Sequence, residues 1–119
     1  MTGVSVLIVD DNAEFRRLAR RLLESGGYSV VGEADDARGA LRAHAALRPD
    51  IVLLDVQLPD GDGFAVAESL AADAEPPIVV LISSRDGAAY RRKLAATTAR
   101  AFLAKGELSL TAFHQAIRT

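Results

Sequence analysis

Residues 51–63 read IVLLDVQLPDGDG. Four apolar residues lead into a single acid, Asp55, and a loop rich in turn-forming residues follows. An apolar run of this length, ended by Asp and then by Pro and Gly, is typical of a buried strand that delivers its acid to the edge of a sheet. We therefore interpret Asp55 as the chemical centre of the protein, with the rest of the chain building its pocket or responding to its state.

The composition is that of one small globular domain. The chain has 119 residues and is 50% hydrophobic, which is enough for a single domain with a real core. It contains no Cys, so neither a disulfide framework nor a thiolate site is expected, and no apolar run approaches the ~20 residues of a membrane span. The N-terminus lacks the basic segment of a signal peptide, and a net charge of −2 offers no argument for nucleic-acid binding. We expect one domain over residues 1–119 that contacts neither nucleic acid nor membrane directly.

Strand and helix patterns alternate five times along the chain. Apolar runs suited to strands stand at residues 4–9, 28–34, 51–54, 78–82 and 101–104. Each is followed by a helical pattern, and such alternation with short connections predicts a parallel sheet with helices on both faces. The continuously apolar first, third and fourth strands belong in the centre, and the more polar second strand at an edge. Right-handed crossovers then favour the flavodoxin-like order 2-1-3-4-5.

Local signals mark the ends of the helices. Asp11 and Glu14 have the spacing of a capping box at the start of the first helix. The inner face of that helix is predicted to hold Phe15, Leu18, Ala19, Leu22 and Leu23. Later helices are predicted to begin at Asp35-Asp36, Asp62 and Ser109. Pro49 is expected to end the second helix by keeping Arg48 out of the helical region.

Other polar residues fall on helices rather than at strand ends. We interpret His44 and His114 as surface or boundary residues and not as metal ligands. The basic residues 16, 17, 20 and 21 on the first helix are predicted to be solvated, with that face as a candidate partner surface. Residues 86–96 form a weaker helix, because they include few large apolar side chains.

Polar residues follow the strands that the predicted order places together. Asp10 and Asp11 follow the first strand, Asp55 the third, Ser83 the fourth and Lys105 the fifth. In this fold the carboxyl ends of all strands meet at one edge, where ligands bind at the switch point between strands 1 and 3. Neighbouring strands are ~4.8 Å apart, so the three carboxylates are predicted to share one small pocket.

Three carboxylates this close repel one another, by ~4 kcal/mol per pair at 4 Å and an effective dielectric near 20. Either one acid takes up a proton or a cation binds, and Lys105 alone supplies too little positive charge. A hard divalent cation with oxygen ligands, Mg²⁺ in the first place, suits such a site, and Mn²⁺ can substitute. A metal, a lysine, a hydroxyl and a nucleophilic carboxylate together suit phosphoryl transfer.

These residues closely resemble the receiver domain of bacterial two-component response regulators. The resemblance covers essentially the whole chain and comprises the acid pair, the acceptor motif DVQLPDG at residues 55–61, a hydroxyl, an aromatic residue and a lysine. It implies that Asp55 accepts a phosphoryl group from a partner histidine kinase. Asp11 would bind Mg²⁺ directly and Asp10 largely through water, while Asp55 and the backbone carbonyl of Gln57 complete the ligands. A cytoplasmic location is implied as well.

The resemblance also assigns a switch. Ser83 and Lys105 would bind the phosphoryl oxygens, and Phe102 would change rotamer as Ser83 moves. Gln57 and Arg85, two residues beyond Asp55 and Ser83, would control the lifetime of the acyl phosphate. The surface of the fourth helix, fifth strand and fifth helix would then be read by an effector domain or by a second copy of the chain.

One position departs from the family pattern. The family often has Pro after the lysine with a cis peptide before it, whereas Gly106 stands here. A cis bond before a residue other than Pro costs ~3 kcal/mol, so we expect a trans bond, or a cis bond held by its surroundings. The loop at residues 58–61 and the helix start at residues 106–109 look most like receivers of NarL/LuxR-type transcription regulators.

Alternative functions remain within this reading of the sequence. The chain is either a stand-alone receiver, acting by protein contact or in a phosphorelay, or the receiver of a larger regulator. An aspartate-nucleophile phosphohydrolase would carry an Asp two residues after the nucleophile, where Gln57 stands, so we expect no enzyme beyond self-phosphorylation and autodephosphorylation. A flavin carrier of the same fold would need a phosphate-binding loop after the first strand, where Asp10 and Asp11 repel phosphate.

Overall fold

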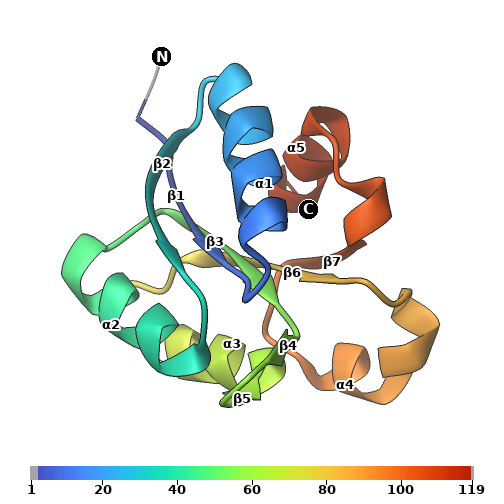
Figure 1. The fold of residues 1–119 in the computed structure, drawn as a ribbon. Helices are drawn as coiled ribbons and strands as arrows, with labels where there is room; N and C mark the ends of the chain where they lie inside the picture. Colours follow the sequence, from blue (N-terminus) through green and yellow to red (C-terminus); the bar gives the residue numbers. More distant parts are fainter. Residues whose placement is uncertain (1–2, 119) are drawn as a thin grey trace.

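A computed structural model describes residues 3–118, and its centre is a five-stranded parallel sheet (Figure 1). The strands are β1 (Ser5–Val9), β2 (Ser29–Ala34), β3 (Ile51–Asp55), β6 (Ile78–Ser83) and β7 (Ala101–Ala104). Their order is β2-β1-β3-β6-β7, which is the predicted order 2-1-3-4-5 once a small hairpin is set aside. That hairpin, β4 (Gln57–Leu58) with β5 (Gly61–Asp62), lies in the loop after Asp55 and was not predicted from the sequence.

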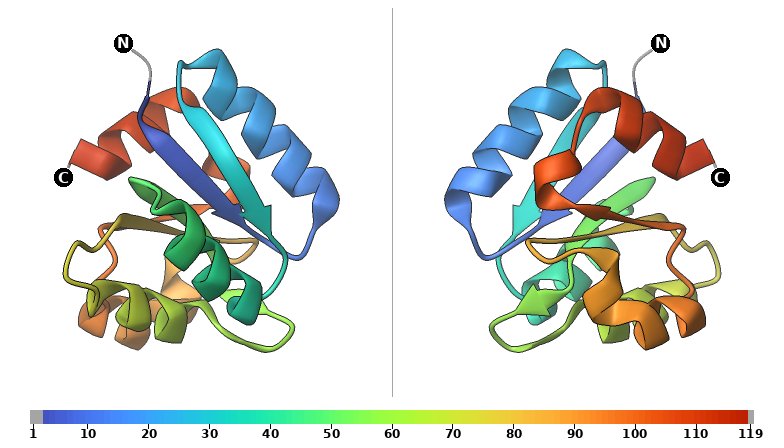
Figure 2. Two further views of the ribbon diagram at one scale, coloured as in Figure 1. Left: turned by 90° about the vertical axis from the view of Figure 1, so that its left-hand side faces the viewer. Right: turned by 90° about the vertical axis from the view of Figure 1, so that its right-hand side faces the viewer.

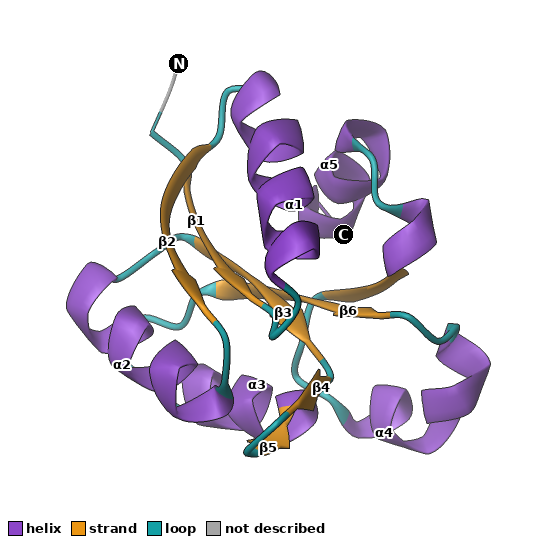
Figure 3. Ribbon diagram, in the orientation of Figure 1, coloured by secondary structure: helices purple, strands orange, loops and turns teal. Residues whose placement is uncertain are grey.

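Helices cover both faces of the sheet, as Figures 2 and 3 show. They are α1 (Ala13–Ser25), α2 (Ala37–Leu47), α3 (Gly63–Ala71), α4 (Arg91–Ala96) and α5 (Leu110–Arg118). Single 3₁₀ turns, η1 (Gly87–Tyr90) and η2 (Lys105–Glu107), precede the last two. One face carries α1 and α5, and the other carries α2, α3 and α4. The doubly wound architecture is therefore confirmed.

The strand pleat divides the core between these two faces. In β1 and β3, alternate residues pack toward opposite helical layers. The first layer, under α1 and α5, holds Val6, Ile8, Ile51, Leu53 and Phe113. The second, under α2 and α3, holds Leu7, Val9, Val52, Leu54 and Phe64. β1 and β3 lie in the centre of the sheet and are buried on both faces. This burial is the reason why their sequences are continuously apolar.

Several predicted helix ends are confirmed. Asp36 and Asp62 are the N-caps of α2 and α3, and each side chain accepts a backbone N–H of the first turn. Ser109 accepts the N–H of Ala112 at 3.0 Å at the start of α5. Arg48 ends α2 in the left-handed region, with φ 49° and ψ 55°, just before Pro49. No peptide bond within residues 3–118 is cis, so the trans bond expected between Lys105 and Gly106 is confirmed.

The capping box predicted at Asp11 is wrong. Asn12 is the N-cap of α1, and its side-chain oxygen accepts the N–H of Phe15 at 3.1 Å. The N–H of Asn12 itself donates to Asp10 Oδ1 at 2.8 Å. This contact turns the chain immediately after β1 and places Asn12, one residue later than predicted, at the cap. The exposed carboxylate of Asp11 therefore has no capping role.

Three predictions about solvent exposure also need correction. Leu18 was expected inside but is 61% exposed, because the face of α1 against the sheet is narrow and only Ala19 and Leu23 are fully covered. His44 is buried rather than at a boundary, since α2 turns it toward the core. The basic face of α1 is not uniformly solvated: Arg16 and Arg20 both form ion pairs with Glu33 of the edge strand β2, at 2.9 and 2.8 Å.

Within residues 3–118, no helix has both the length and the apolar character that crossing a membrane requires.

Candidate functional site

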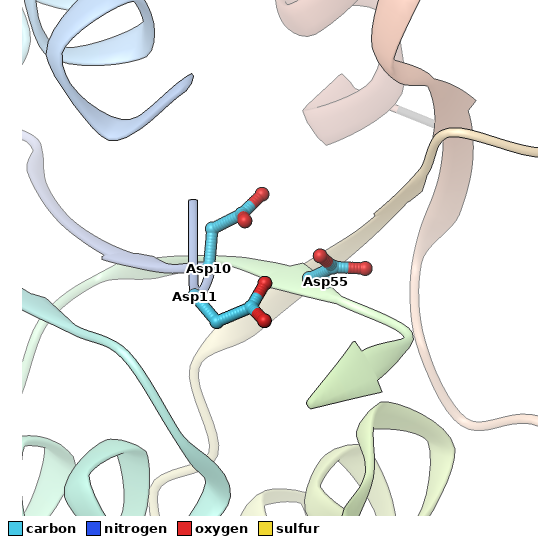
Figure 4. Close-up of side chains that lie close together, drawn as sticks. All are labelled: Asp10, Asp11 and Asp55. Atoms are coloured by element: carbon cyan, nitrogen blue, oxygen red, sulfur yellow. The ribbon is translucent and has the colours of Figure 1, made fainter. Parts of the chain in front are cut away.

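Three acids meet at the carboxyl edge of the sheet (Figure 4). Asp10 and Asp11 follow β1, and Asp55 ends the neighbouring strand β3. Each offers a carboxylate oxygen, and these oxygens lie within 4.8 Å of one another. Asp10 and Asp55 are buried, whereas Asp11 is exposed at the mouth of the cluster. The convergence predicted from the strand ends is therefore present in the structure.

The Asp55 carboxylate is held by two different partners. Its Oδ1 accepts the backbone N–H of Gln57 at 3.0 Å, and its Oδ2 lies 3.2 Å from Lys105 Nζ. Burial raises the pKa of Asp55, and the nearby Asp10 adds to that rise. The Gln57 N–H and the Lys105 ammonium act in the opposite direction, but the pKa stays above its usual value. A buried carboxylate in this setting is poorly solvated, and its two contacts fix its orientation. Both properties suit a nucleophile.

Lys105 joins the two buried acids. Its Nζ lies 2.7 Å from Asp10 Oδ2 and 3.2 Å from Asp55 Oδ2. Burial alone would lower the pKa of Lys105, but the two carboxylates outweigh burial and raise it. The ammonium also sits 4.7 Å from the centre of the Phe15 ring. Lys105 therefore remains charged at neutral pH and neutralises one of the three acids.

The donor set fits a hard divalent cation. Three carboxylates against one ammonium leave an excess of two negative charges in a small, partly buried site. Asp10 Oδ2 is buried and has no hydrogen-bond partner besides its ion pair with Lys105, so this oxygen can still accept a further ligand. Carboxylate oxygens with room for water are the ligands that Mg²⁺ prefers, and the same donors suit Mn²⁺. Asp10, Asp11 and Asp55 are the residues that could hold such an ion.

The acid pair is braced from α1. Arg16 donates through Nη1 to the backbone oxygen of Asp10 at 2.6 Å, and its Nε pairs with Glu33. The turn that carries Asp10 and Asp11 is thereby tied to both α1 and the edge strand. The sequence predicted Arg16 to be part of a solvated face. A helical pattern gives no information on how close Arg16 of α1 lies to Glu33 of β2.

The loop after Asp55 is packed tightly against it. Gly63, the first residue of α3, donates its N–H to the carbonyl of Val56 at 2.9 Å. A β-carbon at position 63 would overlap the Asp55 carbonyl oxygen and lie 2.7 Å from Val56 Cα. Asp60 in the same loop accepts the N–H groups of Ala37 at 2.6 Å and of residue 38 at 3.1 Å. These bonds lower the pKa of Asp60 and tie the loop to the start of α2.

Ser83 ends β6 beside this cluster and is buried. Its Oγ accepts the N–H of Arg85 at 3.0 Å and donates to the hydroxyl of Tyr90 at 3.3 Å. The sequence places Tyr90 in the weak helical segment 86–96, and its hydroxyl contact with Ser83 was not predicted. The available signal was a hydroxylated aromatic residue in a segment that is otherwise almost free of large apolar side chains.

Phe102 lies on β7 and is half-buried. Its ring centre is 6.0 Å from that of Tyr90, which in turn is 5.7 Å from that of Phe64. Tyr90 therefore stands in an aromatic row with its hydroxyl on Ser83. The rotamer change expected of Phe102 stays a prediction, but the residue that bonds Ser83 in this structure is Tyr90.

The two candidate lifetime residues, Gln57 and Arg85, are both exposed. Each uses its backbone N–H to bond the functional side chain two residues earlier, Asp55 and Ser83 respectively. Their side chains lie at the solvent side of the site, and the metal-binding role of the Gln57 carbonyl stays a prediction.

Comparison with known proteins places this site in a family. Residues 6–118 match the response regulator receiver domain. The chain is 40% identical over 103 residues to the transcriptional regulatory protein NarL of Mycobacterium tuberculosis, which is 86% of this chain and 48% of that protein. It is 38% identical over 79 residues to the chemotaxis protein CheY of Thermotoga maritima, 66% of each. The solved signal receiver domain of M. tuberculosis NarL superposes with a TM-score of 0.88 at 34% identity, covering 99% of this chain and 98% of that one.

Some relatives are much longer than this chain. It is 40% identical over 81 residues to a protein-glutamate methylesterase/protein-glutamine glutaminase of Hahella chejuensis, 68% of this chain but only 23% of that protein. The chain thus spans about a quarter of that relative and about half of NarL. The family match, by contrast, runs along nearly the whole chain. The chain belongs to the response regulator receiver domain family, the phosphorylation-operated signalling domain of two-component systems.

Proposed function

We propose that Asp55 is the phosphoacceptor of this receiver domain and that a histidine kinase is its donor. The observation that carries the proposal is the position of Asp55: a buried carboxylate at a strand end, flanked by Asp10 and by Lys105 Nζ at 3.2 Å. A carboxylate oxygen of Asp55 would attack phosphorus, forming an O–P bond as the N–P bond of the phosphohistidine breaks. The electron pair of that bond returns to the imidazole, and the product is an acyl phosphate.

The neighbouring side chains have complementary roles in this proposal. Lys105, kept protonated by the two carboxylates, would move to the phosphoryl oxygens and neutralise part of their charge. Ser83 would donate its hydroxyl proton to another of these oxygens. Asp10, Asp11 and Asp55, with the carbonyl of Gln57, would hold Mg²⁺ or Mn²⁺, which supplies charge neutralisation at the transferring group when bound.

Signal output would follow from the added charge. Phosphorylation places about −2 charge at a site that is already rich in acids. Ser83 would be drawn toward it, and the segment after β6 would rearrange, with Phe102 changing rotamer. This segment is suited to motion, because neither η1 nor α4 has a buried residue. The surface of α4, β7 and α5 would then be read by a partner.

The proposed partners are a histidine kinase on the input side and either an effector domain or a second copy on the output side. Similarity to NarL, of which the chain spans 48%, favours transcriptional output through an effector domain. A stand-alone receiver that works by protein contact or phosphorelay is the alternative output. In both cases residues 1–119 form one receiver domain in the cytoplasm, with no direct contact to nucleic acid or membrane and no turnover of an external substrate.

Phosphorylation by acetyl phosphate tests the proposal. Wild-type protein in Mg²⁺ should gain one phosphoryl mass in intact-protein mass spectrometry, and Asp55→Asn should gain none. Asp35→Asn, at an exposed acid in the loop after β2, is the matched control and should be modified like the wild type. Omitting Mg²⁺ should slow the reaction strongly. A folded wild-type protein that stays unmodified, or that steadily hydrolyses phosphate monoesters, would refute the assignment.

A further inference from the structure

The hydrogen bond between Ser83 and Tyr90 links the site to the segment that follows β6. Ser83 is 1% exposed, and its Oγ lies 3.3 Å from the Tyr90 hydroxyl. Tyr90 ends η1 and directly precedes α4. It is therefore a covalent part of the segment proposed to move, while its hydroxyl touches a residue proposed to bind the phosphoryl group.

A serine hydroxyl can donate only one hydrogen bond at a time. A serine side chain has one O–H donor, and that of Ser83 is directed at Tyr90. The backbone N–H of Arg85 already occupies an acceptor position of the same oxygen, at 3.0 Å. Ser83 can donate to a phosphoryl oxygen on Asp55 only after its O–H group turns away from Tyr90. While Ser83 donates to Tyr90 it cannot also donate to a phosphoryl oxygen, so the two bonds compete for one hydroxyl proton.

The ring of Tyr90 fixes where its hydroxyl points. It packs against Phe64 of α3 and Phe102 of β7, with ring centres 5.7 and 6.0 Å away. A β-carbon on Gly87 would lie 3.7 Å from the Phe102 ring, so η1 itself packs on the same row. Apart from such contacts the segment is weakly anchored, because η1 and α4 have no buried residue. Leu94, packed against the same core, and the Lys93–Asp62 ion pair at 2.9 Å also anchor α4, whereas the Tyr90 hydroxyl joins the segment to Ser83.

We propose that Tyr90 is a positioning residue that holds Ser83 away from the phosphoryl position in the unphosphorylated state. This inference rests on the proposed function of Asp55. Loss of the Tyr90 hydroxyl leaves the buried Ser83 hydroxyl without its acceptor only in the unphosphorylated state, because the phosphorylated state supplies a new one. Tyr90 therefore opposes phosphorylation, and its release from Ser83 frees η1 and α4.

Beryllofluoride with Mg²⁺, a stable mimic of the phosphoryl group, provides the test. Wild type, Tyr90→Phe, Ser83→Ala and the double variant are titrated by calorimetry. Tyr90→Phe should bind the mimic about fivefold more tightly than wild type, the factor that corresponds to one net hydrogen bond of about 1 kcal/mol. In the Ser83→Ala background the same change should have no effect, because the hydroxyl that Tyr90 restrains is already gone.

Amide hydrogen exchange gives a second readout. In the free protein, residues 87–96 of Tyr90→Phe should exchange faster than in wild type and approach the wild type bound to the mimic. Equal affinity of Tyr90→Phe and wild type, or unchanged exchange, overturns the proposal. A gain in affinity that persists in the Ser83→Ala background assigns Tyr90 a packing role and overturns it too. A wild type that binds no beryllofluoride instead refutes the phosphoacceptor assignment itself.

Discussion

Gly63 and Asp55 are in backbone contact: a β-carbon on Gly63 would overlap the Asp55 carbonyl oxygen and lie 3.0 Å from its carbonyl carbon. The atoms it would meet are backbone, which cannot turn aside as a flexible side chain can. Any side chain at position 63 therefore pushes α3 away from the strand end that carries the acceptor acid.

Gly63→Ala is accordingly expected to destabilise the protein by about 1–3 kcal/mol, the typical range for overpacking, and to slow phosphorylation of Asp55. Urea unfolding and acetyl phosphate labelling measure the two effects. Gly106→Ala is the matched control, because nothing lies within 4 Å of its β-carbon position and its φ is not positive. The control should keep wild-type stability or gain a few tenths of a kcal/mol. Equal stability of the two variants would contradict this account of Gly63.

Arg16 is expected to support metal binding without touching the metal. Its bonds to the Asp10 carbonyl and to Glu33 hold the turn that positions Asp10 and Asp11. Arg16→Ala should weaken Mg²⁺ binding about tenfold, the lower range for loss of an outer-shell partner. Calorimetric Mg²⁺ titration measures this. Arg17→Ala removes an exposed arginine of the same helix and should leave the affinity unchanged. An Arg16→Ala protein that binds Mg²⁺ like wild type would disprove the bracing role.

Asp73 should make stability depend on pH in the acid range. Its carboxylate accepts two bonds from Arg48, at 2.7 and 2.9 Å, and the N–H of Glu75 at 3.0 Å, while His44 Nε2 lies 3.5 Å away. The hydrogen bonds from Arg48 have the largest effect and the Glu75 N–H the next largest. Together they hold the pKa of Asp73 well below its usual value. Below about pH 4 the unfolded chain therefore binds a proton that the folded chain resists.

The contribution of Asp73 is thus complete above about pH 4 and is lost as the pH falls through the lowered folded-state pKa. Asp73→Asn should lower the melting temperature at pH 7, and the difference from wild type should shrink steadily on acidification. Thermal unfolding followed by circular dichroism from pH 7 to pH 2 measures it. Asp35→Asn should run parallel to wild type throughout. A difference that stays constant to low pH would rule out the ion pair as its cause.

Arg85 is expected to tune the lifetime of the acyl phosphate rather than its formation. Its N–H bonds Ser83 through the backbone, so that bond survives truncation of the side chain, which is exposed beside the site. Arg85→Ala should change the rate of autodephosphorylation several-fold, because the side chain controls water access, while the protein remains fully phosphorylated by excess acetyl phosphate. The decay after removal of the donor, followed by intact mass, measures this. Arg92→Ala, at an exposed arginine of α4, should decay like wild type. If the Arg85→Ala decay matches wild type, the side chain has no such role.

The strand order and the acid cluster were predictable because both depend on local patterns. Continuous apolar runs identify central strands, and right-handed crossovers leave few arrangements of them. Once the strands are ordered, the residue after each strand is placed automatically. Asp10, Asp55, Ser83 and Lys105 therefore converge for a reason that the linear sequence already contains.

Other features depend on how elements pack and were not predictable. Leu18 has the helical spacing of a core residue but is 61% exposed, because the rotation and contact width of α1 on the sheet decide which of its apolar residues are covered. Asn12 rather than Asp11 caps α1, because the Asp10 side chain turns the backbone first. The sequence placed His44 at the surface or at a boundary, but α2 packs against the core and buries this side chain.

By itself, the sequence determined the doubly wound fold, the site at the carboxyl edge of the sheet and the residues that fill it. These follow from periodicity and from the ends of elements, which are properties of neighbouring residues. Only the tertiary structure decided that Gly63 presses on Asp55, that Arg16 braces Asp10 and that the Tyr90 hydroxyl accepts a hydrogen bond from Ser83. Each of these contacts joins different elements, and its geometry depends on packing distances of a few ångströms that no local pattern encodes.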